Sequence, residues 1–244
     1  MKPFLGRSKK SPVRPEKRVR ITQPSPTEKP TFPRLYSALR DHYGQQDWWP
    51  GDSPFEVMVG AILTQNTAWS NVEKALANLV AADVLSLTHM LRLPEPDLAA
   101  LIRPAGYFNL KARRLQNLCR WLHNCGGVMA LSSWETGRLR DALLGVNGVG
   151  METADDILLY ALDRDVFVVD SYTRRFFARI GITDGGDAYD SLRATVEREL
   201  GGGARVFAQF HALIIAHGKA LCRKKPLCDT CPLRSICAFV RASA

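Results

Sequence analysis

Four cysteines near the C-terminus have the spacing of a metal-binding set. Cys222, Cys228, Cys231 and Cys237 follow the pattern C-x5-C-x2-C-x5-C, so their four thiolates can surround one metal centre. Structural zinc and a [4Fe–4S] cluster both accept four cysteines, whereas disulfides are rare in an intracellular chain. Zinc sites usually combine two separated C-x2-C pairs, whereas this set has one; on the residues alone both kinds of centre stay open.

The loop between the first two of these cysteines is strongly basic. Closing residues 223–227 on a metal would present Arg223, Lys224 and Lys225 at the surface. There they can contact phosphates, with an affinity that falls steeply with salt. A solvated charge run without a partner is the alternative. The two remaining cysteines are expected to be buried structural thiols: Cys119 and Cys125.

A Gly-Val-Gly turn at residues 148–150 joins two stretches with helical apolar spacing. Gly148 and Gly150 allow a ligand to approach the backbone closely. The second helix should start at about Met151, and its free N–H groups and dipole point back towards the turn. The turn is therefore a candidate site for a DNA phosphate, a contact that positions a duplex without reading its sequence. An ordinary helix–helix turn is the alternative.

Asp170 is an isolated carboxylate that follows a β-branched run at residues 166–169. Its side chain can cap the next helix, and it can also face a cleft and remain ionised. Such a carboxylate could stabilise an oxocarbenium-like sugar and orient a water for attack at C1′. The two roles are compatible.

Two adjacent tryptophans, Trp48 and Trp49, precede Pro50 in a polar segment. Either both pack into the core, or they form the wall of a base pocket, because aromatic faces bind flipped bases and favour cationic ones. Trp69 could face the same cleft.

The positive charge of the chain lies mainly at its two ends. The net charge is +9; residues 1–33 hold nine Lys or Arg against two acidic residues, and residues 218–241 hold six against Asp229. This distribution favours nucleic acid as the partner. Residues 1–33 also contain seven prolines and are expected to be a disordered basic tail, with a solubilising tail as the alternative role. No apolar run approaches the roughly 18–20 residues of a membrane helix, so an intracellular protein of the cytoplasm or nucleoid, without a membrane partner, is expected.

The remaining pattern predicts an all-α fold that begins near Phe32 or Leu35. Capping boxes are expected at Ser53 with Glu56 and at Ser132 with Glu135, and Gly218 is expected to end a helix. Residues 166–169 fit either a strand or a buried connection. Helices are predicted over residues 55–63, 71–82, 95–103, 110–124, 133–144, 151–162, 172–180, 187–200 and 204–217.

Residues 146–154, together with Asp170, resemble the helix-hairpin-helix motif and following loop of the endonuclease III superfamily of DNA glycosylases. The resemblance runs from about residue 35 to 240 and includes the stretches GAILTQNT at 60–67 and GYFNLKA at 106–112, with the C-terminal cysteines. It implies a monomer with two helical lobes that flank a cleft for double-stranded DNA. The lobes would be a helical barrel with the hairpin, residues 53–165, and a [4Fe–4S] domain, residues 34–52 plus 166–244.

The resemblance also assigns roles to matching residues. Asp170 would be catalytic, Gln65 and Tyr107 would fill or wedge the gap left by a flipped base, and Lys111 would contact a phosphate. For Gln65, a buried hydrogen-bonding role at a helix end is the alternative. The full set of DNA-binding residues is then Gln65, Tyr107, Lys111, Gly148, Gly150, Arg223, Lys224 and Lys225.

Glu152 departs from the pattern of the bifunctional members. These enzymes place a lysine two residues after the second hairpin glycine, and its amine forms a Schiff base that leads to strand cleavage. A carboxylate cannot form that imine, and no lysine lies between Lys111 and Lys219. We therefore expect base removal without a lyase step. A plain surface-helix role for Glu152 is the alternative.

The Trp-Trp-Pro segment and Glu152 together resemble the monofunctional 3-methyladenine glycosylase branch. That resemblance implies base binding by Trp48, Trp49, Pro50 and Trp69, to which we add Glu152. The predicted function is excision of alkylated purines by hydrolysis in base excision repair. Two alternatives remain: an endonuclease III-like glycosylase and lyase acting on oxidised pyrimidines, and a non-catalytic DNA-binding or redox-sensing iron–sulfur module.

Overall fold

The computed structural model describes residues 30–46, 48–49 and 51–242. Within that part of the chain the regular secondary structure is entirely helical, which confirms the predicted fold class. The α-helices are α1 Phe32–Tyr43, α2 Pro54–Leu63, α3 Trp69–Ala81, α4 Leu87–Arg92, α5 Glu95–Leu101, α6 Phe108–Asn124, α7 Thr136–Leu144, α8 Met151–Asp156, α9 Ser171–Ile180, α10 Tyr189–Leu200, α11 Gly203–Ala220 and α12 Ala238–Ala242. Four shorter helical segments complete the set: η1 Arg103–Ala105, η2 Val128–Ser133, the π-helix η3 Ile157–Ala161, and η4 Arg234–Ile236.

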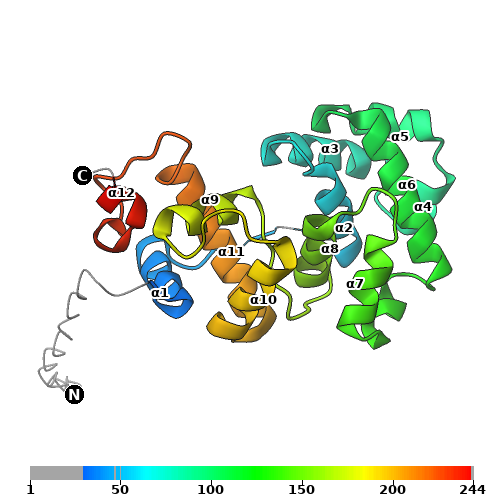
Figure 1. Cartoon of the computed structure of the whole chain (residues 1–244). Coiled ribbons are helices and arrows are strands. Elements are labelled where there is room, and N and C mark those ends of the chain that lie inside the picture. The colour runs from blue at the N-terminus through cyan, green and yellow to red at the C-terminus, as the bar shows by residue number, and fades with distance from the viewer. Residues whose placement is uncertain (1–29, 47, 50, 243–244) are drawn as a thin grey trace, which may run out of the picture.

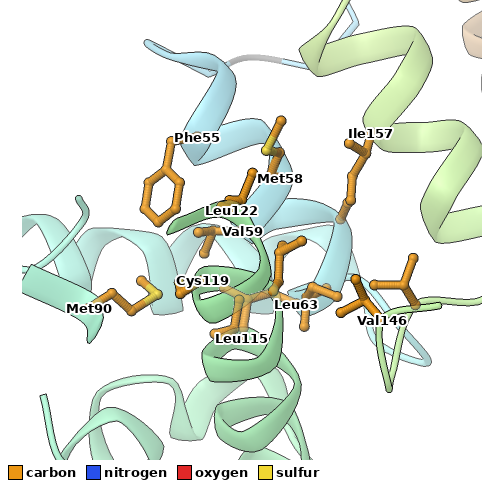
Figure 2. Packing of buried hydrophobic residues seen from close by; sticks show 14 of the residues in the cluster. Phe55, Met58, Val59, Leu63, Met90, Leu115, Cys119, Leu122, Val146 and Ile157 are labelled. Carbon is orange, nitrogen blue, oxygen red and sulfur yellow. The ribbon is translucent and has the colours of Figure 1, made fainter. Parts of the chain in front are cut away.

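The helices pack around two hydrophobic cores, one in each lobe of the molecule (Figure 1). The first core joins buried side chains of α2 to α8; Figure 2 shows Met58, Leu63, Leu115 and Cys119 packed within it. The second core joins α1 to α9, α10 and α11. In Figure 1 the helices α2 to α8 form one lobe, and α1 with α9 to α12 form the other.

The start of α2 follows the predicted capping box. The Ser53 hydroxyl accepts a hydrogen bond from the Glu56 N–H at 3.2 Å, and Pro54 takes the first helical position. The prediction of a second capping box, at Ser132 with Glu135, was wrong. Ser132 belongs to η2, and α7 begins at Thr136, because the Glu135 carboxylate itself accepts from the N–H groups of the two residues after Thr136.

Gly218 does not end a helix, contrary to the prediction, because α11 continues to Ala220. A Cβ at this position would lie 2.5 Å from a ring carbon of Tyr172. The glycine is therefore needed where α9 approaches α11 closely. This contact brings the start of α9 against the last turns of α11.

The second helix of the hairpin starts at Met151, as predicted, but changes character after Asp156. From Ile157 it continues as a π-helix, a feature often found at functional sites. Residues 166–169 then form a buried extended connection rather than a strand. This connection leads directly to Asp170 at the start of α9.

The N-terminal helix α1 was not predicted as such. It starts at Phe32, whose side chain is buried, one residue before the predicted end of the tail at residue 33. Residues 1–29 lie outside the described residues, and their expected disorder stays a prediction. Across the described ranges, no helix has the combination of length and apolar character needed to cross a bilayer.

Candidate active site

A cavity of about 540 Å³ lies between the two lobes, within the size range of small-molecule sites. Its walls come from the segment before α2, the loop between α2 and α3, helix α8, the start of α9 and the last turns of α11. The aromatic and charged side chains of this lining are Trp48, Trp49, Trp69, Glu152, Asp156, Asp170, Tyr172, His211 and Lys219.

One wall of the cavity is aromatic. The Trp49 ring packs edge-on against Trp69, with 5.4 Å between ring centroids, and lies 5.0 Å from the Tyr160 ring. Gly60 makes room for it, since a Cβ there would lie 3.3 Å from the indole nitrogen of Trp49. The Lys219 ammonium lies 5.1 Å from the Trp48 ring centroid. All three tryptophans expected at a base pocket thus line one cavity.

Pro50, which was predicted to line the same pocket, lies outside the described residues. Trp48 and Trp49 are both half-buried, so neither is fully buried in the core, although Trp49 packs against the core of the first lobe. Trp49 adopts a left-handed backbone with φ of 63°. For a bulky residue this conformation is strained, and it orients the indole towards the cavity wall.

Asp170 caps α9 and also lines the cavity. Its side chain is 8% exposed, and Oδ1 accepts a hydrogen bond from the Thr173 N–H at 2.7 Å. Burial raises the pKa of Asp170, but the His211 imidazole and the Thr173 N–H outweigh it, and the pKa lies below its ordinary value. Asp170 is therefore ionised in neutral solution.

Tyr160 contacts His211, and His211 in turn approaches Asp170. The Tyr160 hydroxyl lies 2.6 Å from His211 Nδ1, and His211 Nε2 lies 3.7 Å from Asp170 Oδ2, which is longer than a hydrogen bond. Burial raises the pKa of Tyr160 far above its ordinary value, so the phenol keeps its proton. When the phenol donates to Nδ1, the neutral imidazole carries its proton on Nε2, which points at the carboxylate.

Two further carboxyls line the cavity from α8. Glu152 is exposed in the cleft, yet the surrounding protein and the nearby Asp170 raise its pKa. Asp156 lies one helical turn later and is only 4% exposed. Sequence reasoning missed Asp156, although its i,i+4 spacing from Glu152 puts both on one helical face.

The hairpin turn has the geometry that its glycines predict. Gly148 has φ of 101°, and a Cβ there would collide with the Arg114 side chain. Gly150 has an extended backbone, and a Cβ on it would point into open space. The turn is therefore open at Gly150, beside the free N–H groups of α8.

Gln65 is tied to this turn. Its amide nitrogen donates to the Gly148 carbonyl at 3.0 Å and to the Thr153 hydroxyl at 2.9 Å, and Arg114 donates to its amide oxygen. These bonds support the hydrogen-bonding alternative for Gln65 in the DNA-free protein. Tyr107, by contrast, is 70% exposed with φ of 44°, so its ring is free at the surface.

The expectation that Lys111 contacts a DNA phosphate was wrong. Its side chain is 1% exposed, and the ammonium donates to the carbonyls of Leu63 at 2.9 Å and Ala105 at 2.7 Å. Burial, with a smaller effect of the Arg114 charge, lowers the pKa of Lys111 to about 8. Lys111 therefore joins the end of α2 to the η1 turn inside the protein and has no free ammonium for a phosphate.

The four C-terminal cysteines line one largely apolar cavity beside α9 and α11. Burial and the other three thiols raise the pKa of Cys231, so the four sulfurs act on one another electrostatically. Within the described residues, no three His, Cys, Asp or Glu side chains are gathered closely enough to hold a single metal ion. Four thiols around a shared cavity fit a cluster with several irons, because its ligands are spread more widely than those of one zinc.

The side chains of the basic loop at 223–225 are exposed, and its backbone is hydrogen-bonded to the protein. Arg179 of α9 donates to the carbonyls of Cys222, Arg223 and Lys224. These bonds keep the backbone in place and leave the three cationic side chains at the surface. The two other cysteines differ from each other: Cys119 is fully buried, as expected, and Cys125 is half-buried.

Comparison with known proteins agrees with this architecture. Residues 59–201 match the family model of the HhH-GPD superfamily of base excision DNA repair proteins. A protein of Methanocaldococcus jannaschii, provisionally named a DNA repair glycosylase, is 48% identical over 207 residues, which cover 84% of this chain and 94% of the relative. Endonuclease III of Sulfolobus acidocaldarius is 26% identical over 189 residues, which cover 76% and 82% of the two chains.

Solved structures show the same fold. The 3-methyladenine DNA glycosylase of H. pylori, determined with 1,N6-ethenoadenine bound, has a TM-score of 0.69 and 30% identity, over 78% of this chain and 97% of that one. An endonuclease III–DNA complex has a TM-score of 0.72 at 23% identity, over 86% and 94% of the two chains. This chain belongs to the HhH-GPD superfamily of base excision DNA repair proteins.

Proposed function

We propose that this protein is a monofunctional DNA glycosylase that excises alkylated, 3-methyladenine-like purines from duplex DNA by hydrolysis. The observation that carries the proposal is that an ionised Asp170 faces three tryptophans across one cavity. The hairpin helix supplies a carboxyl, Glu152, where a lyase needs an amine. The family is one of base excision repair, so base release is the reaction that this cavity serves.

The mechanism follows from the charge on Asp170. The bond between C1′ and the purine nitrogen breaks with its electron pair leaving on the base, and positive charge develops on the sugar. The buried carboxylate stabilises that charge. A water oxygen then bonds to C1′, and its proton passes to the carboxylate and on to solvent. The products are the free base and an abasic site.

The aromatic wall supports an N-alkylated purine as substrate. Such a base is already cationic, so it leaves as a neutral molecule and needs no proton from the enzyme. Tryptophan faces attract a cation through their ring quadrupole. The H. pylori relative, named for 3-methyladenine and solved with a modified adenine, gives further support.

A second candidate function has one observation in its favour. Lys219 comes from α11 and lines the same cavity, with its ammonium over Trp48. Its amine could replace the missing hairpin lysine in an endonuclease III-like lyase. We give it second place because Lys219 lies on the opposite lobe from the hairpin helix.

The proposal is tested by base release from duplex DNA carrying alkylated, oxidised or deaminated bases, followed by alkali to expose abasic sites. Wild type should release alkylated purines and give no borohydride-trapped adduct. Asp170→Asn keeps a good helix cap but removes the charge, and its rate should fall about 10²–10³-fold with DNA binding retained. A trapped adduct that disappears in Lys219→Gln would establish the lyase instead.

We also propose that the protein binds damaged duplex DNA as an intracellular monomer and that its cysteines hold a [4Fe–4S] cluster. Cys222, Cys228, Cys231 and Cys237 would be the ligands, and the cluster would be a structural brace for the loop. The exposed cations of residues 223–225 and the open turn at Gly150 would then contact phosphates on the two sides of the cleft. The lobes would be residues 53–165 and residues 34–52 plus 166–244.

A further inference from the structure

Asp156 is a buried carboxyl of the base cavity that the mechanism above does not use. It projects from α8 into the cavity that Asp170 and the tryptophans line. Its side chain is 4% exposed, and among the described residues no hydrogen bond or ion pair engages its carboxyl. An unpaired carboxyl in such a place costs stability, so packing does not explain it.

The groups around Asp156 are mostly acidic. Glu152 and Asp155 lie on its own helix, and Asp170 faces it from the start of α9; all three raise its pKa, after burial, which is the largest effect. Asp155 is itself paired with Arg140. The basic groups in the cavity, His211 and Lys219, come from α11, where His211 is directed at Asp170 and Lys219 at Trp48.

Burial and the three nearby carboxyls all disfavour the ionised form of Asp156 and favour its protonated form. A neutral carboxyl offers one O–H donor and one carbonyl acceptor side by side, whereas an ionised one offers acceptors alone. The matching edge on a base has an acceptor beside a donor. Adenine has such an edge at N7 and its 6-amino group, while the corresponding edge of guanine, N7 and O6, presents two acceptors.

We propose that the buried, unpaired carboxyl of Asp156 reads the extruded base, donating a proton to N7 and accepting from the amino group of an adenine-derived lesion. The inference rests on the proposed function and narrows its substrate class to modified adenines over modified guanines. The same cavity holds a second buried polar atom without a hydrogen bond in the described structure, His211 Nε2, which lies 3.7 Å from Asp170 Oδ2.

The test compares two cationic purines in the same methylated duplex DNA. 3-Methyladenine keeps N7 and its amino group free, whereas 7-methylguanine has N7 blocked. Under single-turnover conditions, Asp156→Leu should release 3-methyladenine about tenfold or more slowly, in line with the discrimination of one bidentate contact. Release of 7-methylguanine should change little. Asp156→Asn keeps a donor and an acceptor and should stay within about threefold of wild type.

The pH profile separates a reading role from a structural one. The wild-type rate on 3-methyladenine should fall in alkaline solution as Asp156 loses its proton, and Asp156→Asn should abolish that fall. Asp156→Leu should melt at or above the wild-type temperature, because an unpaired buried carboxyl has been replaced by an apolar side chain. If Asp156→Leu does not fold, the profile of Asp156→Asn decides.

The outcomes distinguish this inference from the function on which it rests. If wild type releases no alkylated base, the proposed function fails. If wild type is active and Asp170→Asn is not, but Asp156→Leu keeps the full rate and the wild-type preference for 3-methyladenine, only the role of Asp156 is overturned. An Asp156→Asn variant that retains the alkaline fall overturns it as well.

Discussion

A buried ion pair joins two helices of the first lobe and extends to α10 of the second, and removing its cation should destabilise the fold strongly. Arg140 of α7 binds Asp155 of α8 through two hydrogen bonds, 2.7 and 3.1 Å long, and the Asp155 carboxylate is fully buried. The same guanidinium reaches Asp190 of α10 at 2.7 Å, and Arg193 of α10 lies 3.9 Å from Asp155. We therefore expect Arg140→Met to weaken both the first lobe and its contact with α10.

The size of the stability loss follows from the Asp155 charge, which stays buried when Arg140 is removed. Breaking a buried pair by removing one partner costs about 3–5 kcal/mol, because the other charge stays buried. Arg193 still faces Asp155 and compensates part of that charge, so we expect the lower end, about 3 kcal/mol. For a chain of this size, that corresponds to a fall in melting temperature of about 6–12 °C.

The pH dependence has a definite sign. Burial raises the pKa of Asp155, and Arg140 offsets part of the rise, so the pKa should rise further in Arg140→Met. The folded variant then takes up a proton more readily than the unfolded chain. The loss of folding stability in Arg140→Met, relative to wild type, should therefore be largest at neutral pH. It should become smaller as the pH falls through the raised pKa of Asp155.

Chemical denaturation at pH 7 and pH 5 measures both effects. The matched control is Arg198→Met, which breaks an exposed pair with Glu199 and should cost less than about 0.5 kcal/mol. The double variant Arg140→Met/Asp155→Leu should recover much of the loss. A loss below about 1 kcal/mol for Arg140→Met at pH 7, or one that does not shrink at pH 5, would refute this reasoning.

Two further predictions concern the DNA-binding and cysteine residues. Lys111→Met removes the donor from two buried carbonyls and should cost about 2–4 kcal/mol of stability; the salt dependence of DNA affinity should stay unchanged, whereas a lost phosphate contact would flatten it. Cys222→Ser should remove the iron and its visible absorption and, by freeing the loop at 223–225, should weaken DNA binding and lower its salt dependence; iron content equal to wild type would contradict the proposed ligand set.

The sequence predicted those parts of the site that depend on local pattern. Ser53, Met151 and Asp170 occupy helix starts, and a helix start is encoded by side-chain oxygens, prolines and glycines close in the chain. The Lys111 error came from neglecting such a pattern. Lys111 lies in register with Leu115 and Leu118 on the buried face of α6, so the helical period itself places the lysine inward.

The groups that sequence reasoning missed are those gathered by packing between the lobes. His211 and Lys219 line the cavity from α11, and Tyr160 of η3, about 50 residues earlier in the chain, contacts His211. No local pattern encodes that meeting, because it depends on how α11 packs against η3. The π-helix at Ile157 also changes the register of the side chains that follow it, which a regular helical period does not predict.

The difference between the pKa values of Asp170 and Asp156 comes from His211, which acts on Asp170, and from the backbone around the two carboxyls. Both carboxyls are nearly buried in one cavity, and burial raises the pKa of each. His211 and Thr173 bring the pKa of Asp170 below its ordinary value, whereas neighbouring carboxyls raise that of Asp156 further. Asp170 stands at a helix start, where a free N–H of Thr173 reaches its oxygen. Asp156 stands within a helix, where the N–H groups are already bonded to carbonyls. One cavity therefore holds two carboxyls whose pKa values are shifted in opposite directions. Such a pair is what the proposed division between an anion for the sugar and an acid for the base requires.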